Sequence, residues 1–299
     1  MKNTSFSRNS SFRSSRNRFG SGNSSFKSRG RFSATVGRSF NRSSRRSRGE
    51  QIDISKFVKR SISMDSTENN KISHNFADFR FCKELQFNLD KRNYQKPTPV
   101  QDQAILPIMN GKDLIGLADT GSGKTAAFLL PLINKIYHTK YEKVLIIAPT
   151  RELAIQIDNE LRAFSSGMRI YSAVCVGGMP IGRQIQALRQ NPNFVIGTPG
   201  RLRDLSCRGL LKFNIFQNIV LDEVDRMLDM GFVEEISLIL NTLPEKKQAL
   251  FFSATIPEKI RNLVNKFLVS PITVAVKTGD TAANVLQDVV RVSSIFKIN

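Results

Sequence analysis

The sequence predicts an α/β fold in which a parallel β-sheet is flanked by helices and preceded by a disordered basic tail. Short apolar runs alternate with amphipathic helical patterns. The runs have no polar face, which is typical of parallel strands covered on both sides. The expected strands lie within 112–118, 143–149, 172–177, 193–197, 218–222, 249–254 and 272–276. The expected helices include 125–137, 151–165, 180–190, 200–208, 232–241 and 257–268.

The positive charge of the chain is concentrated near its N-terminus. Residues 1–60 hold 16 of the 45 lysines and arginines but only two of the 25 acidic residues. Residues 1–49 contain fifteen serines, six regularly spaced phenylalanines and no acid. Such a segment buries too little apolar surface to fold, so we expect residues 1–60 to be a disordered tail. Arginine attracts phosphates and phenylalanine stacks on bases, which favours RNA as its partner. A solubilising tail and an organelle transit peptide are the alternatives.

Other features of the sequence limit the class of protein. Cys82, Cys175 and Cys207 are far apart and odd in number, which argues against a disulfide framework or a zinc site and predicts a reducing, cytoplasmic location. No apolar run approaches the ~20 residues that cross a bilayer, so no membrane is expected as a partner. We place a linker at 61–74 and a single α/β domain at 75–278, and we expect a monomer.

A glycine-rich segment between an expected strand and an expected helix has the composition of a phosphate-binding loop. It consists of Ala118, Asp119, Thr120, Gly121, Ser122, Gly123, Lys124 and Thr125. Its glycines let backbone N–H groups converge on phosphate oxygens, and the helix N-terminus adds its dipole. We expect Lys124 to reach the β- and γ-phosphates and the Thr125 hydroxyl to ligate Mg²⁺. The usual pattern has glycine in place of Ala118, and such loops also occur by chance.

Two carboxylates close the expected strand at 218–222. Asp222 would hold Mg²⁺ at the strand end, and Glu223 would orient or deprotonate the attacking water. The alternative is an acidic turn that caps the next helix. An acidic pair that closes an apolar strand about 100 residues after a phosphate loop favours the first interpretation. Lys124, Asp222 and Glu223 are therefore the candidate catalytic residues, with ATP and Mg²⁺ as cofactors.

These motifs resemble those of the DEAD-box RNA helicases of superfamily 2, in the order and spacing of that family over residues 75–280. The resemblance implies a RecA-like fold. The segment NYQKPTPVQ (residues 93–101) is similar to the adenine-reading motif of the family, and Phe76 matches its isolated upstream aromatic. Gln101 would then pair with adenine N6 and N7, and Tyr94 would stack on the base. A proline-bounded helix start is the alternative.

Three further segments, APTRELA, VGG and TPGR, resemble the RNA-backbone motifs of the family. The residues expected to contact RNA are Pro149, Thr150, Arg151, Gly177, Gly178, Thr198, Pro199, Gly200 and Arg201. Helix N-termini, glycines and arginines suit phosphate oxygens, although Thr–Pro is also an ordinary helix cap. No residue in these segments is suited to reading base edges, so we expect RNA binding that is independent of sequence.

The segment DEVD replaces the DEAD of the family, with Val224 in the place of alanine. We expect Val224 to lie in an alternating strand end and to point away from the metal. The resemblance also implies that Ser253 and Thr255 bond to Asp225 through their hydroxyls. These contacts would relay the nucleotide state to a second domain.

The family has a second RecA-like domain that supplies arginine fingers and further RNA contacts. No segment like HRIGR or ARG-x-D occurs in the sequence, and residues 279–299 resemble the entry into that domain. We therefore expect a truncated frame or fragment that hydrolyses ATP slowly, whereas the intact protein would unwind RNA locally. The rival functions are a DNA-directed helicase of the same superfamily and a non-enzymatic RNA-binding or annealing protein that acts through its tail.

Overall fold

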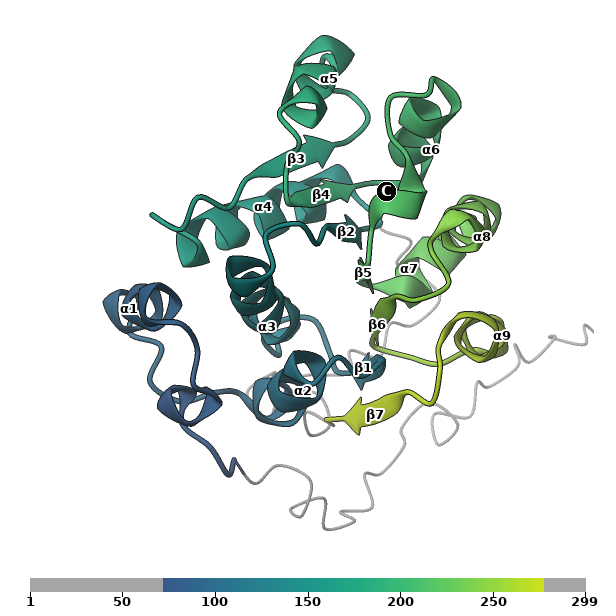
Figure 1. Cartoon of the computed structure of the whole chain (residues 1–299). Coiled ribbons are helices and arrows are strands. Elements are labelled where there is room, and N and C mark those ends of the chain that lie inside the picture. The colour runs from purple at the N-terminus through teal and green to yellow at the C-terminus, as the bar shows by residue number, and fades with distance from the viewer. Residues whose placement is uncertain (1–71, 277–299) are drawn as a thin grey trace, which may run out of the picture. The chain divides into compact units, whose positions relative to one another are not determined.

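The computed structural model describes residues 72–276. The basic tail, most of the linker and the expected strand of a second domain lie outside the described residues. Residues 72–276 contain a seven-stranded sheet in the order β3-β4-β2-β5-β6-β1-β7 (Figure 1), and every neighbouring pair is parallel. The strands are β1 (Leu114–Leu117), β2 (Val144–Ile147), β3 (Ser172–Cys175), β4 (Phe194–Gly197), β5 (Asn218–Leu221), β6 (Gln248–Ser253) and β7 (Ile272–Ala275). The predicted α/β class and the seven strands predicted between residues 112 and 276 are confirmed.

Helices cover both faces of this sheet. The α-helices are α1 (Lys83–Lys91), α2 (Pro99–Met109), α3 (Lys124–His138), α4 (Arg151–Phe164), α5 (Ile181–Arg189), α6 (Pro199–Cys207), α7 (Val224–Asp229), α8 (Val233–Thr242) and α9 (Glu258–Phe267). Residues 72–276 also contain two 3₁₀ turns, η2 (Phe76–Phe79) and η3 (Phe213–Ile215). Helices α1–α4 share one apolar core with one face of the strands, and α5–α9 share a second core with the other face (Figure 1). No helix among residues 72–276 is both long and apolar enough to cross a membrane.

The two edge strands differ from the expectation that all strands lack a polar face. Strands β2, β4, β5 and β6 are buried at every position. In β3 buried and half-buried residues alternate, and in β7 only Val274 is buried. Both strands lie at an edge of the sheet, where helices cover only part of the surface. The sequence pattern therefore located these strands but overestimated their burial.

Helix α1 was not predicted, α2 and α7 were predicted only as alternative interpretations, and α7 corrects the interpretation of Val224. Strand β5 ends at Leu221, and Glu223 adopts a left-handed backbone conformation with φ 53°. This residue reverses the chain direction, so Val224 opens a helix and does not continue a strand. Its side chain is fully buried in the core shared by α5–α9. A valine at this position is accommodated because it packs with apolar neighbours.

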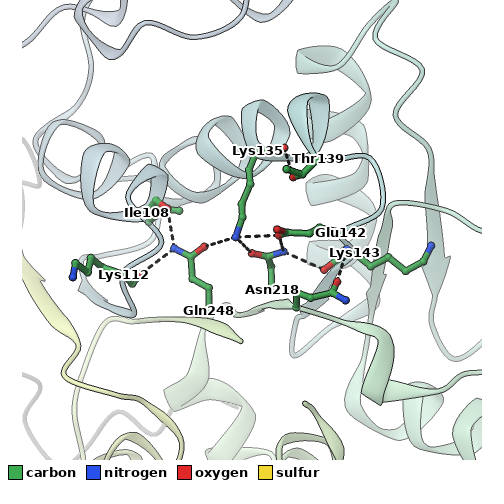
Figure 2. Close-up of polar contacts among 9 residues, drawn as sticks. Ile108, Lys112, Lys135, Thr139, Glu142, Lys143, Asn218 and Gln248 are labelled. Carbon is green, nitrogen blue, oxygen red and sulfur yellow. Dashed lines mark hydrogen bonds and ion pairs between the residues drawn. The ribbon is translucent and has the colours of Figure 1, made fainter. Parts of the chain in front are cut away.

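A polar network ties the amino ends of β5 and β6 to the helices above them (Figure 2). Lys135 Nζ donates to Asn218 Oδ1 at 2.7 Å and lies 3.1 Å from Glu142 Oε2 and 3.4 Å from Gln248 Oε1. Asn218 also donates to Glu142, and Gln248 donates to the carbonyl oxygens at the end of α2. The lysine thus satisfies three oxygen acceptors at the end of the sheet opposite the strand C-termini.

We expect Lys135→Met to lower the free energy of unfolding by ~2–3 kcal/mol, because it leaves Glu142 and two amide oxygens without their cation in a largely buried position. The midpoint of urea unfolding measures this loss. Lys140→Met is the control, since it removes the same charge at an exposed position, and it should change stability by less than about 0.5 kcal/mol. Equal midpoints for the two variants would contradict the role given to the network.

Candidate functional site

The predicted nucleotide-binding residues converge on one cavity at the carboxyl ends of the parallel strands. Its volume is about 510 Å³. The predicted residues that line it are Tyr94, Gln101, Thr120, Gly121, Gly123, Lys124, Thr125, Asp222 and Glu223. Thr150, predicted for RNA contact, also lies in its wall. Four loops that are far apart in sequence therefore meet around a single space.

The phosphate-binding loop connects β1 to α3 along the floor of this cavity. The Ala118 N–H donates to the Ser253 carbonyl at 3.2 Å, which fixes the start of the loop to the end of β6. Gly121 and Gly123 have φ values of +84° and +97°, which only glycine adopts without strain. Helix α3 begins at Lys124, so the N–H groups of its first turn lack helical partners and face the cavity beside the loop. This geometry fits a phosphate group.

Lys124 is held inside the loop that it belongs to. Its ammonium donates to the Ala118 carbonyl at 2.8 Å, and the residue is 7 % exposed. Ala118 thus contributes its carbonyl, whereas its methyl group is buried below the loop. Asp119 and Ser122 are not among the residues that line the cavity, and the buried Ser122 hydroxyl has no hydrogen-bond partner in the described part of the chain.

Asp222 and Glu223 follow β5 and lie across the cavity from the loop. Burial raises the pKa of Asp222 to about 6, and the nearby Lys124 ammonium opposes that rise. Glu223 occupies its left-handed conformation and pairs with Arg226 at 3.1 Å. A non-glycine residue in this conformation costs ~1–3 kcal/mol and is found preferentially at functional sites. The backbone strain therefore lies at the carboxylate that was predicted to act on water.

Thr125 and Asp222 supply a hydroxyl and a carboxylate to the same cavity. Mg²⁺ is usually held by one or two protein oxygen ligands together with substrate phosphates and water. Among residues 72–276 no group of three or more His, Cys, Asp or Glu side chains could hold a metal alone. The donor set therefore fits Mg²⁺ that arrives with a nucleotide.

Of the residues predicted to contact adenine, Gln101 and Tyr94 line the cavity. Gln101 is 3 % exposed; its oxygen accepts from the Thr98 N–H at 2.9 Å, and its amide donates to the Gly123 carbonyl at 3.1 Å. The oxygen keeps a second lone pair and the amide a second N–H, so the side chain can pair with a base while these bonds remain. The Thr98–Gln101 bond is also a helix cap, so the proline-bounded helix start and the cavity contact are both present.

Phe76 does not line this cavity. It is 2 % exposed and packs behind Tyr94, with their ring centroids 5.8 Å apart. Tyr94 reaches the cavity and also contacts the ring of Phe164 at 5.4 Å. The Phe76 ring therefore belongs to the core next to Tyr94, and its expected part in nucleotide binding stays a prediction.

The expected contacts of Asp225 are confirmed. The hydroxyl of Thr255 donates to Asp225 Oδ2 at 3.1 Å, and the Ser253 hydroxyl accepts from the Asp225 N–H at 3.2 Å. Burial alone would raise the pKa of Asp225, but hydrogen bonds from Arg226, Thr255 and Ser253 lower it overall. These bonds join the turn after β5 to the turn after β6.

The predicted RNA-contacting segments also lie side by side, since they follow the neighbouring strands β2, β4 and β3. Arg151 and Arg201 each donate to a carbonyl of the glycine turn after β3, at Gly178 and Met179 respectively, both at 3.5 Å. Thr150 caps α4 by accepting from the Leu153 N–H, whereas the Thr198 hydroxyl makes no such bond. The sheet thus brings two helix N-termini, two arginines and a glycine turn onto one edge.

Sequence reasoning missed one wall of the cavity. It is formed by α4 side chains and by Arg226 of α7; the α4 residues are Glu152, Leu153, Gln156 and Glu160. Three of these are polar and recur every four residues, a spacing that places them on one helix face. That stripe was visible in the sequence, but only the tertiary structure shows which face meets the cavity.

Comparison with known proteins links this geometry to one family. A family model described as DEAD/DEAH box helicase matches residues 98–263. The chain is 42 % identical over 214 residues to the DEAD-box ATP-dependent RNA helicase CshA of Bacillus subtilis, covering 71 % of this chain and 43 % of that protein. It is 42 % identical over 208 residues to the ATP-dependent RNA helicase DeaD of Escherichia coli, covering 69 % of this chain and 33 % of that protein. The chain thus spans less than half the length of these relatives.

The fold is also similar to solved structures. A DEAD box protein from Methanococcus jannaschii superposes with a TM-score of 0.65 at 36 % identity, covering 68 % of this chain and 56 % of that one. A hypothetical ATP-dependent RNA helicase from Sulfolobus tokodaii gives 0.61 at 34 % identity, covering 65 % and 57 %. Both similarities include the sheet that carries the cavity, which supports the predicted RecA-like fold.

We expect Gly123→Ala to weaken binding of ADP with Mg²⁺ by about tenfold or more, the equivalent of at least ~1.4 kcal/mol. An added Cβ would lie 2.5 Å from Gln101 Nε2 and 2.9 Å from Thr98 Oγ1, so the loop must move. Isothermal titration calorimetry measures the affinity. Gly111→Ala, which also has positive φ but has open space around the added carbon, controls for backbone strain and should bind ADP normally. Wild-type affinity in the Gly123 variant would contradict this geometry.

Proposed function

The chain belongs to the DEAD/DEAH box helicase family, and we propose that it is the ATP-binding half of an ATP-dependent RNA helicase. It binds ATP with Mg²⁺ and the backbone of single-stranded RNA. In the intact two-domain protein, ATP hydrolysis is coupled to local unwinding of an RNA duplex. The chain acts as a monomer in the cytoplasm, a location consistent with its three unpaired cysteines.

The observation that carries this proposal is the convergence of three recognition elements on one cavity. The glycine loop and α3 N-terminus suit phosphates, Thr125 and Asp222 suit the metal, and Gln101 with Tyr94 suits the base. Each element alone also occurs in ordinary structural roles. A shared cavity of about 510 Å³ that they line together is expected of a nucleotide site.

In the proposed reaction, Lys124 leaves the Ala118 carbonyl and neutralises the β- and γ-phosphate oxygens. Glu223 accepts a proton from, or orients, the water that attacks the γ-phosphorus, and a positioned base of this kind contributes roughly 10²–10⁴-fold in rate. Mg²⁺, when bound, offsets the charge of the phosphate oxygens. Arg226 holds the Glu223 carboxylate at 3.1 Å and so limits its orientations.

The turn formed by Asp225, Ser253 and Thr255 relays the state of the nucleotide to the second domain. Asp222 and Glu223 lie three and two residues before Asp225, so a change at the phosphates reaches Thr255 through this short segment and one side-chain hydrogen bond. No segment of this sequence resembles an arginine-finger motif, and such a residue contributes ~10³–10⁵-fold in related phosphoryl transfers. We therefore propose that this chain alone hydrolyses ATP slowly.

We expect Lys124→Ala to abolish binding of ADP with Mg²⁺, because it removes the cation that faces the phosphates. Glu223→Gln should bind ADP as the wild type does but lose ~10²–10⁴-fold in hydrolysis rate. Calorimetry gives the affinities, and single-turnover assays with enzyme in excess give the rates. Unchanged hydrolysis by the glutamine variant would remove Glu223 from the proposed reaction.

Arg201→Ala should weaken binding to single-stranded RNA and reduce the slope of log K against log salt by about 0.7, the value for one lost phosphate contact. Fluorescence anisotropy over a range of salt concentrations measures both quantities. Arg203→Ala is the matched control, since it removes the same charge from the same helix. Arg203 pairs with Glu235 at 3.2 Å, whereas Arg201 donates to the glycine turn at Met179 and lies 3.8 Å from Asp204. Similar losses in the two variants would assign the effect to net charge and not to the predicted track.

A further inference from the structure

Asp102, the residue after Gln101 on α2, is a buried carboxylate with a role that the nucleotide site does not explain. It is 6 % exposed. One of its oxygens accepts from the Ser73 N–H at 3.0 Å, and the other accepts from the His74 N–H at 3.0 Å and lies 2.8 Å from His74 Nδ1. Both oxygens therefore bind the segment of residues 72–79, which we call the strap.

The strap leads from this clasp to the wall of the nucleotide cavity through a chain of aromatic rings. The His74 ring lies 5.6 Å from the Phe79 ring, Phe79 lies 6.1 Å from Phe76, and Phe76 lies 5.8 Å from Tyr94. Phe76 and Phe79 are each 2 % exposed. Rings packed at these distances transmit a displacement because protein cores leave little free volume.

Tyr94 depends on this support because it lies between two cavities. One is the nucleotide cavity, and the other, of about 370 Å³, is lined by Tyr94, Phe76 and strap residues next to Phe76. The Tyr94 ring packs against the rings of Phe76 and Phe164. If the strap detached, Phe76 would leave this position and Tyr94 would lose one of its two ring contacts.

We propose that Asp102 and His74 form a clasp that positions Tyr94 and so sets the affinity of the site for the adenine base. This inference rests on the proposed ATP-binding function and adds two positioning residues to it. The clasp is attached to the helix turn that carries Gln101, so it fixes both base-contacting residues relative to each other. The hydrogen bonds of the Asp102 carboxylate go to Ser73 and His74 and not to the phosphate loop.

The effect of the clasp is therefore specific to the base. In the proposed function, the phosphates contact Lys124, Thr125 and the N-terminus of α3. These groups are held by the start of the phosphate loop, where Ala118 follows β1 and bonds to the end of β6. Loss of the clasp leaves these groups in place, because the bond that joins α2 to the loop runs from Gln101 to the Gly123 carbonyl and does not involve Asp102. Stacking on an aromatic ring requires that ring to be in a fixed position, so the base contribution falls first.

The test uses the full 299-residue chain with two probes, ADP and inorganic pyrophosphate, each with Mg²⁺. In Asp102→Asn, only one oxygen remains to accept, and an N–H of the amide faces a backbone N–H of the strap. We expect ADP affinity to fall about tenfold, within the range for losing one base–aromatic stack, and pyrophosphate affinity to stay unchanged. His74→Ala keeps the backbone bonds and should give a smaller loss of the same kind.

Asp113→Asn is the matched control. Asp113 is also buried, at 8 % exposure, and its two oxygens accept from the Ala249 N–H at 2.8 Å and the Val269 N–H at 2.7 Å. It anchors a loop at the amino end of β1, away from the cavity. This variant should lose stability without a change in the ratio of ADP affinity to pyrophosphate affinity.

The outcomes separate this inference from the proposed function. Wild-type ADP affinity in a folded Asp102→Asn variant would overturn the clasp and leave the nucleotide site standing. Two results would show that Asp102 only stabilises the fold. One is an equal loss of affinity for ADP and pyrophosphate, and the other is the same change in the ratio of the two affinities for Asp113→Asn. A wild-type chain that binds neither probe would overturn the proposed function and the clasp with it. If Asp102→Asn does not fold, His74→Ala decides by the same criteria.

Discussion

The parallel arrangement of the strands is the constraint on which the other features depend. In a parallel sheet all strands have their carboxyl ends on the same side, so the loops that leave these ends lie together there. The phosphate loop after β1, the carboxylates after β5 and the Ser–Thr turn after β6 come together for this reason. The segments predicted to contact RNA follow β2, β4 and β3 and are neighbours for the same reason. The opposite edge carries the Lys135 network, which closes the sheet with satisfied polar groups (Figure 2).

At the carboxyl ends of the strands, two of the candidate binding side chains are bonded to backbone carbonyls of the phosphate loop. Lys124 donates to the Ala118 carbonyl, and Gln101 donates to the Gly123 carbonyl. These bonds keep buried polar groups satisfied, which matters because an unpaired buried group costs ~1–3 kcal/mol. They also hold the loop in its curved conformation before a nucleotide arrives. In the proposed function, phosphate and base atoms would meet groups that are already in position, since Lys124 and Gln101 each keep further N–H donors.

The base side of the cavity is held less directly than the phosphate side. The phosphate loop is continuous with β1 and α3, whereas Tyr94 depends on rings supplied by η2 and α4. The clasp at Asp102 connects this support to the helix that carries Gln101. Phe76 and Phe79 of the strap lie in the core that α1–α4 share, so the strap is joined to the base pocket through that core.

The sequence alone determined the position of the strands and of most candidate site residues. The features that it did not determine have physical causes. Apolar runs bounded by glycine, proline and acidic residues located all seven strands, and the motif spacing identified the phosphate loop, Asp222, Glu223 and the Asp225 contacts. These features are local or follow from strand order. Tertiary packing decided how deeply β3 and β7 are buried and that Val224 lies in a helix. It also decided that the Phe76 ring packs in the core against Tyr94. The α4 wall and the Asp102 clasp join residues that are far apart in sequence, because which helix face meets a cavity depends on how the helices pack on the sheet.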